Sequence, residues 1–300
     1  MNKAEFSEAL HSPESLRHRS ETVSGGLPAL MVQAEHLAAT IMLGFHGRRR
    51  AGMGDEFWQY RPAEAGDSYR AIDWRRSARA DATFVREKEW QAAQSLMLWV
   101  DDAQSMNFTG GKGRPSKLRR AQTLAMALAI LAVRGGERVG LTNLAEPPKS
   151  GHAQLLRLAT ALMDPAEAPD YGAPEPKVMP AGARAVFLSD FLGPTEAVER
   201  ALTSAADRGV KGALVQILDP DEEAFPFDGR TVFESMSGAI RFETLKAKGL
   251  REAYLERLAE RKDWLERLSR RTGWRLDVHH TDHAPEDALL WLYHALERTR

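Results

Sequence analysis

The pattern of apolar and polar residues divides most of the chain into short apolar runs and longer amphipathic stretches. Apolar residues recur at intervals of three and four from Leu27 to Leu43, which predicts an amphipathic helix. Further along, strands are expected over 96–100, 138–144, 184–188, 212–218 and 274–279, a hairpin over 231–243, and helices over 116–134, 152–163, 195–208, 250–272 and from 285. Strands separated by helices are typical of a doubly wound, mainly parallel sheet. We therefore predict an α/β fold with three layers.

The first of these strands organises the candidate chemistry. Leu96 to Val100 is apolar on both faces, as expected of a strand covered on both sides, and it ends in Asp101 and Asp102. Asp190 follows the strand over 184–188 in the same way. Open α/β sheets bind ligands at the carboxyl ends of their strands. We expect these carboxylates to lie along one edge of the sheet.

Two segments do not follow the alternation of strand and helix. Residues 164–182 contain five prolines and predict a surface connection. Residues 44–89 are rich in glycine and arginine, which predicts turns and short strands. We expect this second segment to brace the sheet, with Phe57, Tyr60 and Trp74 buried.

The same segment carries a signature of several residues. It contains Gly66, Asp67, Arg70, Asp73, Trp74, Ser77, Ala78 and Arg79, followed by Arg86-Glu87. This resembles the signature of the bacterial family called domain of unknown function 58. The resemblance implies a von Willebrand factor A-like, Rossmann-like three-layer domain over 95–300. Residues 1–94 would then form an N-terminal helix and an irregular brace. Without the family, the signature reads as an ion network that fixes an irregular segment.

The spacing Asp101-x-Ala103-x-Ser105 resembles the Asp-x-Ser-x-Ser motif of the metal-ion-dependent adhesion site in von Willebrand factor A domains. The resemblance implies a Mg²⁺ site formed by Asp101, Ser105 and Asp190. Ala103 stands where the motif has a serine, and the loop from 144 to 152 holds Ser150 but no threonine. We expect a degenerate site with weakly bound Mg²⁺ or none. The open alternative is that Asp101 caps a helix or bonds backbone amides.

Composition excludes several classes of site and partner. The formal net charge is -1, and there are no cysteines, which excludes disulfides, thiolate zinc sites and cysteine nucleophiles. The polar N-terminus and the lack of a long apolar run predict a cytoplasmic protein without a membrane segment. Asp55 and Glu56 dilute the charge of Arg48 to Arg50, so we expect no nucleic-acid binding. His279, His280 and His283 lack a recognised zinc spacing.

Three functions remain open. The family resemblance implies a non-enzymatic interaction adaptor that works with a MoxR-type AAA+ ATPase in the assembly or maturation of other proteins. The alternative is a Mg²⁺-dependent hydrolase that uses Asp101, Asp190 and Asp219 at the edge of the sheet. The third, nucleic-acid binding through the arginines at 48–50, 75, 76 and 79, requires these side chains to be exposed on one face.

Overall fold

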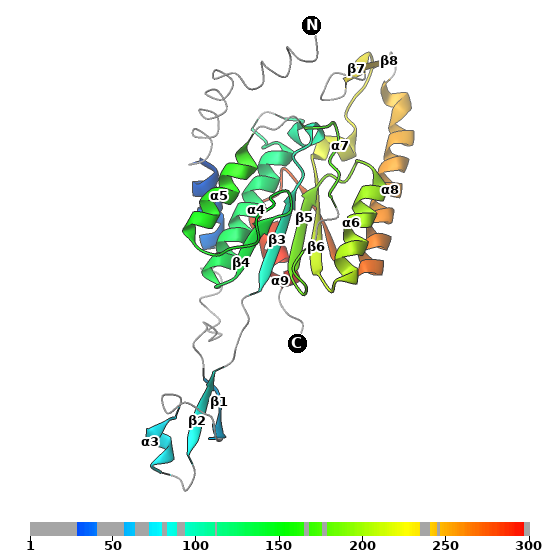
Figure 1. Cartoon of the computed structure of the whole chain (residues 1–300). Helices are drawn as coiled ribbons and strands as arrows, with labels where there is room; N and C mark the ends of the chain where they lie inside the picture. The colour runs from blue at the N-terminus through cyan, green and yellow to red at the C-terminus, as the bar shows by residue number, and fades with distance from the viewer. Residues whose placement is uncertain are drawn as a thin grey trace, which may run out of the picture.

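The computed structural model describes residues 29–40, 57–63, 72–79, 83–88, 94–111, 113–164, 168–175, 179–234, 241–244 and 247–296. Figure 1 shows a sheet between two layers of helices, with a small hairpin beyond one edge of the sheet. Gly66, Asp67, Arg70 and Arg48 to Arg50 lie outside the described residues.

The centre of the molecule is a parallel sheet of five strands in the order β4-β3-β5-β6-β9. The strands are β3 (Ser95–Val100), β4 (Arg138–Leu141), β5 (Arg184–Ser189), β6 (Lys211–Leu218) and β9 (Arg275–His280). The chain therefore runs outward in two directions from a switch point between β3 and β5, as in other doubly wound folds. This architecture confirms the predicted fold class.

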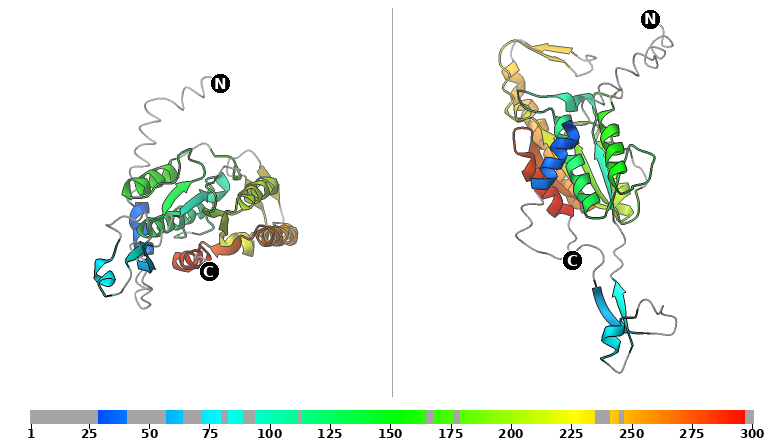
Figure 2. Two further views of the ribbon diagram at one scale, coloured as in Figure 1. Left: turned by 60° about the horizontal axis from the view of Figure 1, so that its bottom comes forward. Right: turned by 90° about the vertical axis from the view of Figure 1, so that its left-hand side faces the viewer.

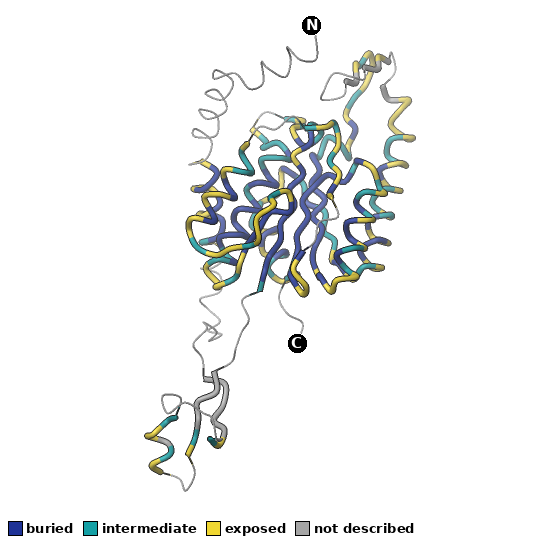
Figure 3. The backbone as a smooth tube through the Cα atoms, viewed as in Figure 1, coloured by how far each residue is buried: buried dark blue, intermediate teal, exposed yellow. Residues whose placement is uncertain are grey.

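Helices cover both faces of the sheet (Figures 1 and 2). One face packs against α4 (Lys117–Arg134), α5 (His152–Met163) and α9 (Pro285–Leu296), and the helix over residues 29–40 belongs to the same hydrophobic cluster. The other face packs against α6 (Thr195–Asp207) and α8 (Arg251–Thr272). Figure 3 shows the result as a buried sheet whose covering helices are exposed only on their outer sides.

Strand β3 illustrates why the sequence forms this sheet. Leu96, Leu98 and Val100 belong to the core under α4, while Met97 and Trp99 belong to the core under α6 and α8. Side chains alternate between the two faces of a strand, so a strand that is apolar at every position must be covered on both. All six residues of β3 are buried, as predicted.

Local signals set the ends of the helix that follows β3. Ser116 caps α4 by accepting a hydrogen bond from the backbone N–H of Arg119, with 3.2 Å between Oγ and N. At the other end, Gly135 donates its N–H to the Leu131 carbonyl, and Gly136 takes a positive φ of 80°. The predicted cap and the predicted stop are both confirmed.

The helix over residues 29–40 is part of the core of the sheet domain. Leu30, Ala34, Leu37 and Ala38 are almost completely buried in the same cluster as α4 and α9. Figure 2 shows this helix beside α4 and α9. The N-terminal extension predicted over residues 1–94 includes this helix. The boundary at residue 94 stays a prediction, and the helix shares a hydrophobic cluster with α4 and α9.

The segment between that helix and β3 contains an antiparallel hairpin, β1 (Phe57–Pro62) and β2 (Phe84–Lys88), with the short helix α3 (Trp74–Ser77). Ser77 ties α3 to β2, since its Oγ donates to the Asp73 carbonyl and accepts from the Phe84 N–H. Trp74 is 58% exposed, so the expectation that it is buried was wrong. The side chains of Phe57 and Tyr60 lie outside the described residues.

The remaining elements lie at and beyond the end of the sheet where its parallel strands have their carboxyl termini. They are the 3₁₀ turns η2 (Gln104–Asn107) and η3 (Ala247–Leu250), the short helix α7 (Pro220–Ala224), and the antiparallel strands β7 (Thr231–Glu234) and β8 (Arg241–Thr244). The hairpin predicted over 231–243 is confirmed by the pairing of β7 with β8.

Candidate functional site

Each of the five strands of the sheet ends in a buried polar side chain. These are Asp101 after β3, Thr142 after β4, Ser189 at the end of β5, Asp219 after β6 and Thr281 after β9, all at most 6% exposed. Asp190 follows Ser189 and is 1% exposed. Because the strands are parallel, these groups lie together where the strands have their carboxyl ends. We refer to this end of the sheet as the carboxyl edge. The expected convergence of Asp101 and Asp190 on this edge is thus observed.

Both oxygens of Asp101 are used within the protein. Oδ2 accepts a hydrogen bond of 2.6 Å from Ser189 Oγ, which lies on the neighbouring strand across the switch point. Oδ1 accepts from the backbone N–H of Ala103 at 2.9 Å. Burial raises the pKa of Asp101 to about 6, although these two donors act in the opposite direction. The carboxylate thus bonds a backbone amide, as one of the two sequence interpretations proposed.

The connection between α5 and β5 folds over Asp101. The backbone N–H groups of Gln104 and Ser105 donate to the carbonyls of Pro169 and Asp170, each at 2.9 Å. Gly172 then lies so close that an added Cβ would be 2.0 Å from Asp101 Oδ1. The switch point, where doubly wound folds usually open to a ligand, is therefore filled by residues 168–175.

A buried lysine holds two further carboxylates together. Lys117, the first residue of α4, is 1% exposed, and its Nζ lies 2.8 Å from Asp190 Oδ2 and 2.6 Å from Glu222 Oε1. Burial alone would lower the pKa of Lys117, but Asp190 and Glu222 raise it above its ordinary value. The lysine is therefore a fixed positive charge among the carboxylates of the carboxyl edge.

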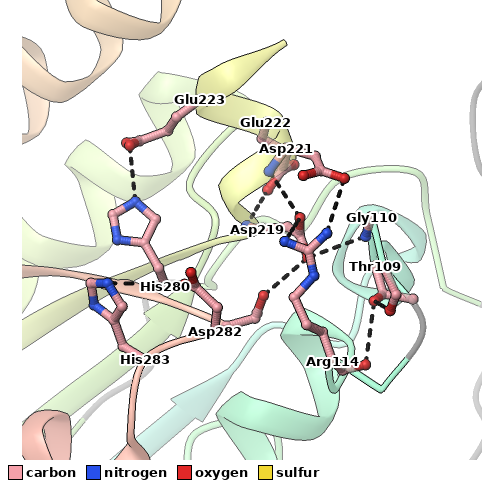
Figure 4. A network of polar contacts seen from close by, with 12 residues as sticks. Thr109, Gly110, Arg114, Asp219, Asp221, Glu222, Glu223, His280, Asp282 and His283 are labelled. Atoms are coloured by element: carbon pink, nitrogen blue, oxygen red, sulfur yellow. Dashed lines mark hydrogen bonds and ion pairs between the residues drawn. The ribbon is translucent and has the colours of Figure 1, made fainter. Parts of the chain in front are cut away.

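Asp219 forms a second centre on the same edge, shown in Figure 4. It caps α7 by accepting from the Asp221 N–H, and it also accepts from the Gly110 N–H and the Thr281 hydroxyl. Arg114 lies 3.4 Å from it. Burial alone would raise the pKa of Asp219, but these donors and the guanidinium lower it below its ordinary value.

Glu222 joins the two centres. Its Oε2 accepts from the backbone N–H of Asp219 at 2.8 Å, completing a capping box, while Oε1 accepts from Lys117. Just outside, Glu223 pairs with Lys262, and its Oε2 lies 2.9 Å from His280 Nε2 (Figure 4). The acidic run after β6 is thus a helix cap linked to α4 and α8.

The histidines of β9 have structural partners. Buried His279 accepts from Arg120 Nη1 at 2.9 Å, because a guanidinium can only donate. Burial lowers the pKa of His279 to about 3, and the charge of Arg120 adds to the effect. His279 is therefore neutral and anchors the buried guanidinium of Arg120.

The residues implied for a metal site do not fit a divalent cation. Ala103 is buried and offers no oxygen, Asp190 Oδ2 is held by an ammonium group, and Gly172 occupies the space over Asp101. Ser105 Oγ is buried without a partner, which leaves one hydroxyl to serve as a ligand. Mg²⁺ requires several oxygens in octahedral geometry. Within the described ranges, no three acidic or histidine side chains are grouped to hold a metal ion.

Sequence reasoning missed the partners of the predicted residues. The motif that drew attention to Asp101 contains none of the residues that hold or cover these carboxylates. Those residues are Lys117, Glu222, Ser189 and Gly172. One signal was available: the first turn of α4 contains no acidic residue and begins with a lysine. A cation at a helix N-terminus opposes the helix dipole, so it indicates a compensating anion nearby.

These observations define the class: a doubly wound α/β domain whose carboxyl edge is closed by its own ion pairs and hydrogen bonds. The chain belongs to the family described as protein of unknown function DUF58, whose model matches residues 59–263. The match confirms the family resemblance of the segment around Trp74.

The curated relatives have no described function. The uncharacterized proteins Rv1480 of Mycobacterium tuberculosis and Mb1516 of Mycobacterium bovis are each 27% identical to this chain over 258 residues, covering 80% of either partner. The crystal structure of the conserved hypothetical protein BatB from Bacteroides thetaiotaomicron overlaps with a TM-score of 0.38 and 13% identity, over 68% of this chain and 98% of that one. That overlap is too small to support an inference.

Two expectations about partners also meet the structure. No helix in the described part of the chain combines the length and the apolar character needed to span a bilayer. Arg75 and Arg79 are exposed on and beside α3, and nucleic-acid binding stays a hypothesis. The arginines at 48–50 and the side chain of Arg76 lie outside the described residues.

Proposed function

We propose that this protein is a non-enzymatic adaptor that binds another protein, and that its binding surface works without a metal ion. The observation that carries the proposal is the internal satisfaction of the carboxyl edge. Asp101, Asp190 and Asp219 all accept hydrogen bonds from neighbours in the same chain. A hydrolase of the predicted kind needs carboxylates that are free to hold a metal ion or to activate water, and these three are already held by donors of the same chain.

The surface above the closed edge offers an anchor for a protein partner. Tyr171 sits next to Gly172 in the covering loop and is 48% exposed. Exposed tyrosines are enriched among residues that dominate binding energy. The same end of the sheet carries an exposed carboxylate, Asp102, directly after β3. Asp221 and Glu223 in α7 are partly exposed and are paired with Arg114 and Lys262. The surface suits a partner with a basic patch around an aromatic-binding pocket.

The kind of partner comes from the family. Family resemblance points to a MoxR-type AAA+ ATPase and to the assembly or maturation of other proteins. A closed, preorganised edge is compatible with this role, because an adaptor must keep its shape while the ATPase changes conformation. We also propose that the protein works in the cytoplasm beside that ATPase.

Co-purification of the tagged full chain at native expression, with and without ATP, tests the proposal. We expect an AAA+ ATPase to be recovered, and Tyr171→Ala to reduce recovery about tenfold or more, the loss typical of an anchor residue. Leu290→Ala is the matched control, because Leu290 is 39% exposed on α9. Recovery of no AAA+ protein in either nucleotide state would overturn the adaptor proposal. Phosphate-ester or peptide hydrolysis that requires added Mg²⁺ and is lost in Asp190→Asn would revive the hydrolase.

A further inference from the structure

A pocket lies beside the first turn of α4. It has a volume of about 520 Å³ and is lined by the helix over 29–40 and by the first turns of α4 and α9. Figure 2 shows these three helices side by side. Among its lining residues are Arg114, Arg119 and Arg120, opposed by one carboxylate, Glu286. The lining is therefore strongly cationic, although the whole chain carries a net charge of only -1.

Two of these arginines have no ion pair among the described residues. Arg119 donates to the neutral Gln33 side chain at 2.9 Å and lies 3.7 Å from Met163 Sδ. Arg120 donates to the backbone carbonyls of Thr281 and His283. Burial lowers the pKa of Arg119, and within the described ranges no neighbouring carboxylate counters this shift. Both groups remain charged, since guanidinium is always protonated in proteins.

The guanidinium groups of Arg119 and Arg120 lie where positive charge does not stabilise the fold. Arg119 and Arg120 belong to the first turn of α4, which contains no acidic residue. Cations near a helix N-terminus are disfavoured by the helix dipole. Lys117 is compensated by Asp190 and Glu222, and the charge of Arg120 is balanced in part by Glu286 and Asp282. The guanidinium of Arg119 has only neutral partners among the described residues, so it leaves an excess positive charge in the pocket.

We propose that this pocket binds a phosphate dianion, either free or as the terminal group of a small phosphate ester. Planar guanidinium groups bind phosphate through paired N–H donors, and Arg119 and Arg120 both line this pocket. Arg119 would contact the phosphate directly, while Arg120, held by His279 and the two carbonyls, would supply charge from the floor of the pocket. Glu286 sets the limit on affinity by repelling the dianion.

Isothermal titration of the purified full chain with inorganic phosphate at constant ionic strength tests this proposal. Parallel titrations with glycerol phosphate, glutamate and chloride separate the ester, a carboxylate and simple salt effects. We expect saturable binding of at least one phosphate probe, weakened about tenfold or more in Arg119→Gln. Tighter binding of glycerol phosphate than of inorganic phosphate would identify the natural ligand as a phosphate ester. Binding of inorganic phosphate at least as tight as that of the ester would identify it as the free ion.

Two variants separate binding from packing. Arg257→Gln removes an exposed charge on α8 and should change nothing, and Glu286→Gln should tighten binding several-fold. Glutamate binding as tightly as phosphate, or equal binding by wild type and Arg119→Gln, would overturn the proposal. Titration heats that fail to saturate with phosphate, as with chloride, would overturn it as well.

Discussion

Lys117 is the residue on which the carboxyl edge depends most. It places one positive charge between Asp190 and Glu222, with the ring of Phe108 centred 5.9 Å from Nζ. A buried charge of this kind is costly to remove from water, and its favourable pairing offsets that cost only while all partners are present. The prediction for this residue follows from that dependence.

Replacing Lys117 by methionine keeps the length of the side chain but leaves two carboxylates unpaired in the interior. We expect the free energy of unfolding to fall by about 3–5 kcal/mol, measured by urea denaturation. Lys149→Met is the matched control, because Lys149 makes an exposed pair with Glu146 and should cost less than about 1 kcal/mol. Adding Glu222→Gln to Lys117→Met should recover part of the loss. Equal losses in the two lysine variants would contradict the account.

Asp101 gives a prediction about pH. Its pKa is about 6 in the folded protein, against the ordinary value of 3.8 in an unstructured chain, so the folded state favours the protonated carboxyl. The contribution of this protonated carboxyl to the free energy of unfolding is therefore fully present below pH 3.8. It is lost as the pH rises through about 6. The difference in pKa corresponds to a loss on the order of 3 kcal/mol above that range.

Asp101→Asn removes this titration while keeping the shape of the side chain. The stability of the variant relative to wild type should therefore increase from pH 4 to pH 7 and then stay constant. Urea unfolding at several pH values measures it, with Asp263→Asn on the exposed side of α8 as the control. Two stability curves that remain parallel across this range would show that burial does not hold the Asp101 carboxyl protonated.

At the scale of elements, the loop over residues 168–175 decides whether the carboxyl edge is open. Two backbone hydrogen bonds attach it to η2, and Gly172 fits over Asp101 because glycine has no Cβ. Gly193 supports it from the next loop, with an added Cβ at 2.7 Å from the Gly172 carbonyl, and Arg261 donates to the Gly193 carbonyl at 2.9 Å. The closed state thus depends on close contact between two glycine-bearing loops.

Gly172→Ala should push this loop off the edge of the sheet. A methyl group 2.0 Å from a carboxylate oxygen cannot be accommodated unless the loop or the hydrogen-bonded side chain of Asp101 shifts, and overpacking of this kind costs about 1–3 kcal/mol. Hydrogen exchange should accelerate at the N–H groups of Gln104 and Ser105, which the loop protects. Gly249→Ala, which meets open space in η3, is the control. Unchanged protection in Gly172→Ala would mean that the loop is not packed on Asp101.

Most elements could be predicted from the sequence, because their signals are local. Alternating strand and helix patterns, the Ser116 cap and the Gly135 stop lie within the segments they define. The burial of Trp74 was predicted wrongly from residue type alone: a tryptophan in a short hairpin has no core to enter unless another element covers it.

At the scale of the whole molecule, the limits of sequence reasoning lie in long-range pairs. Asp101, Asp190 and Asp219 could be placed on one edge because each follows a strand of a parallel sheet. The partners of these aspartates could not be predicted, because Lys117 is 73 residues from Asp190 and 105 residues from Glu222 in the sequence. Spacing within a motif reports which groups are present, but only packing decides whether a lysine, a glycine or a metal ion completes them.

The central claim is that the carboxyl edge is complete without a metal ion. Isothermal titration of the EDTA-treated full chain with Mn²⁺ tests it most directly. The account predicts no saturable binding tighter than about 1 mM for wild type. It predicts the same for Ala103→Ser, because the ammonium of Lys117 still holds Asp190 and Gly172 still covers Asp101. Stoichiometric micromolar binding by wild type, abolished in Asp190→Asn, would contradict the account and place a metal ion where we assign Lys117.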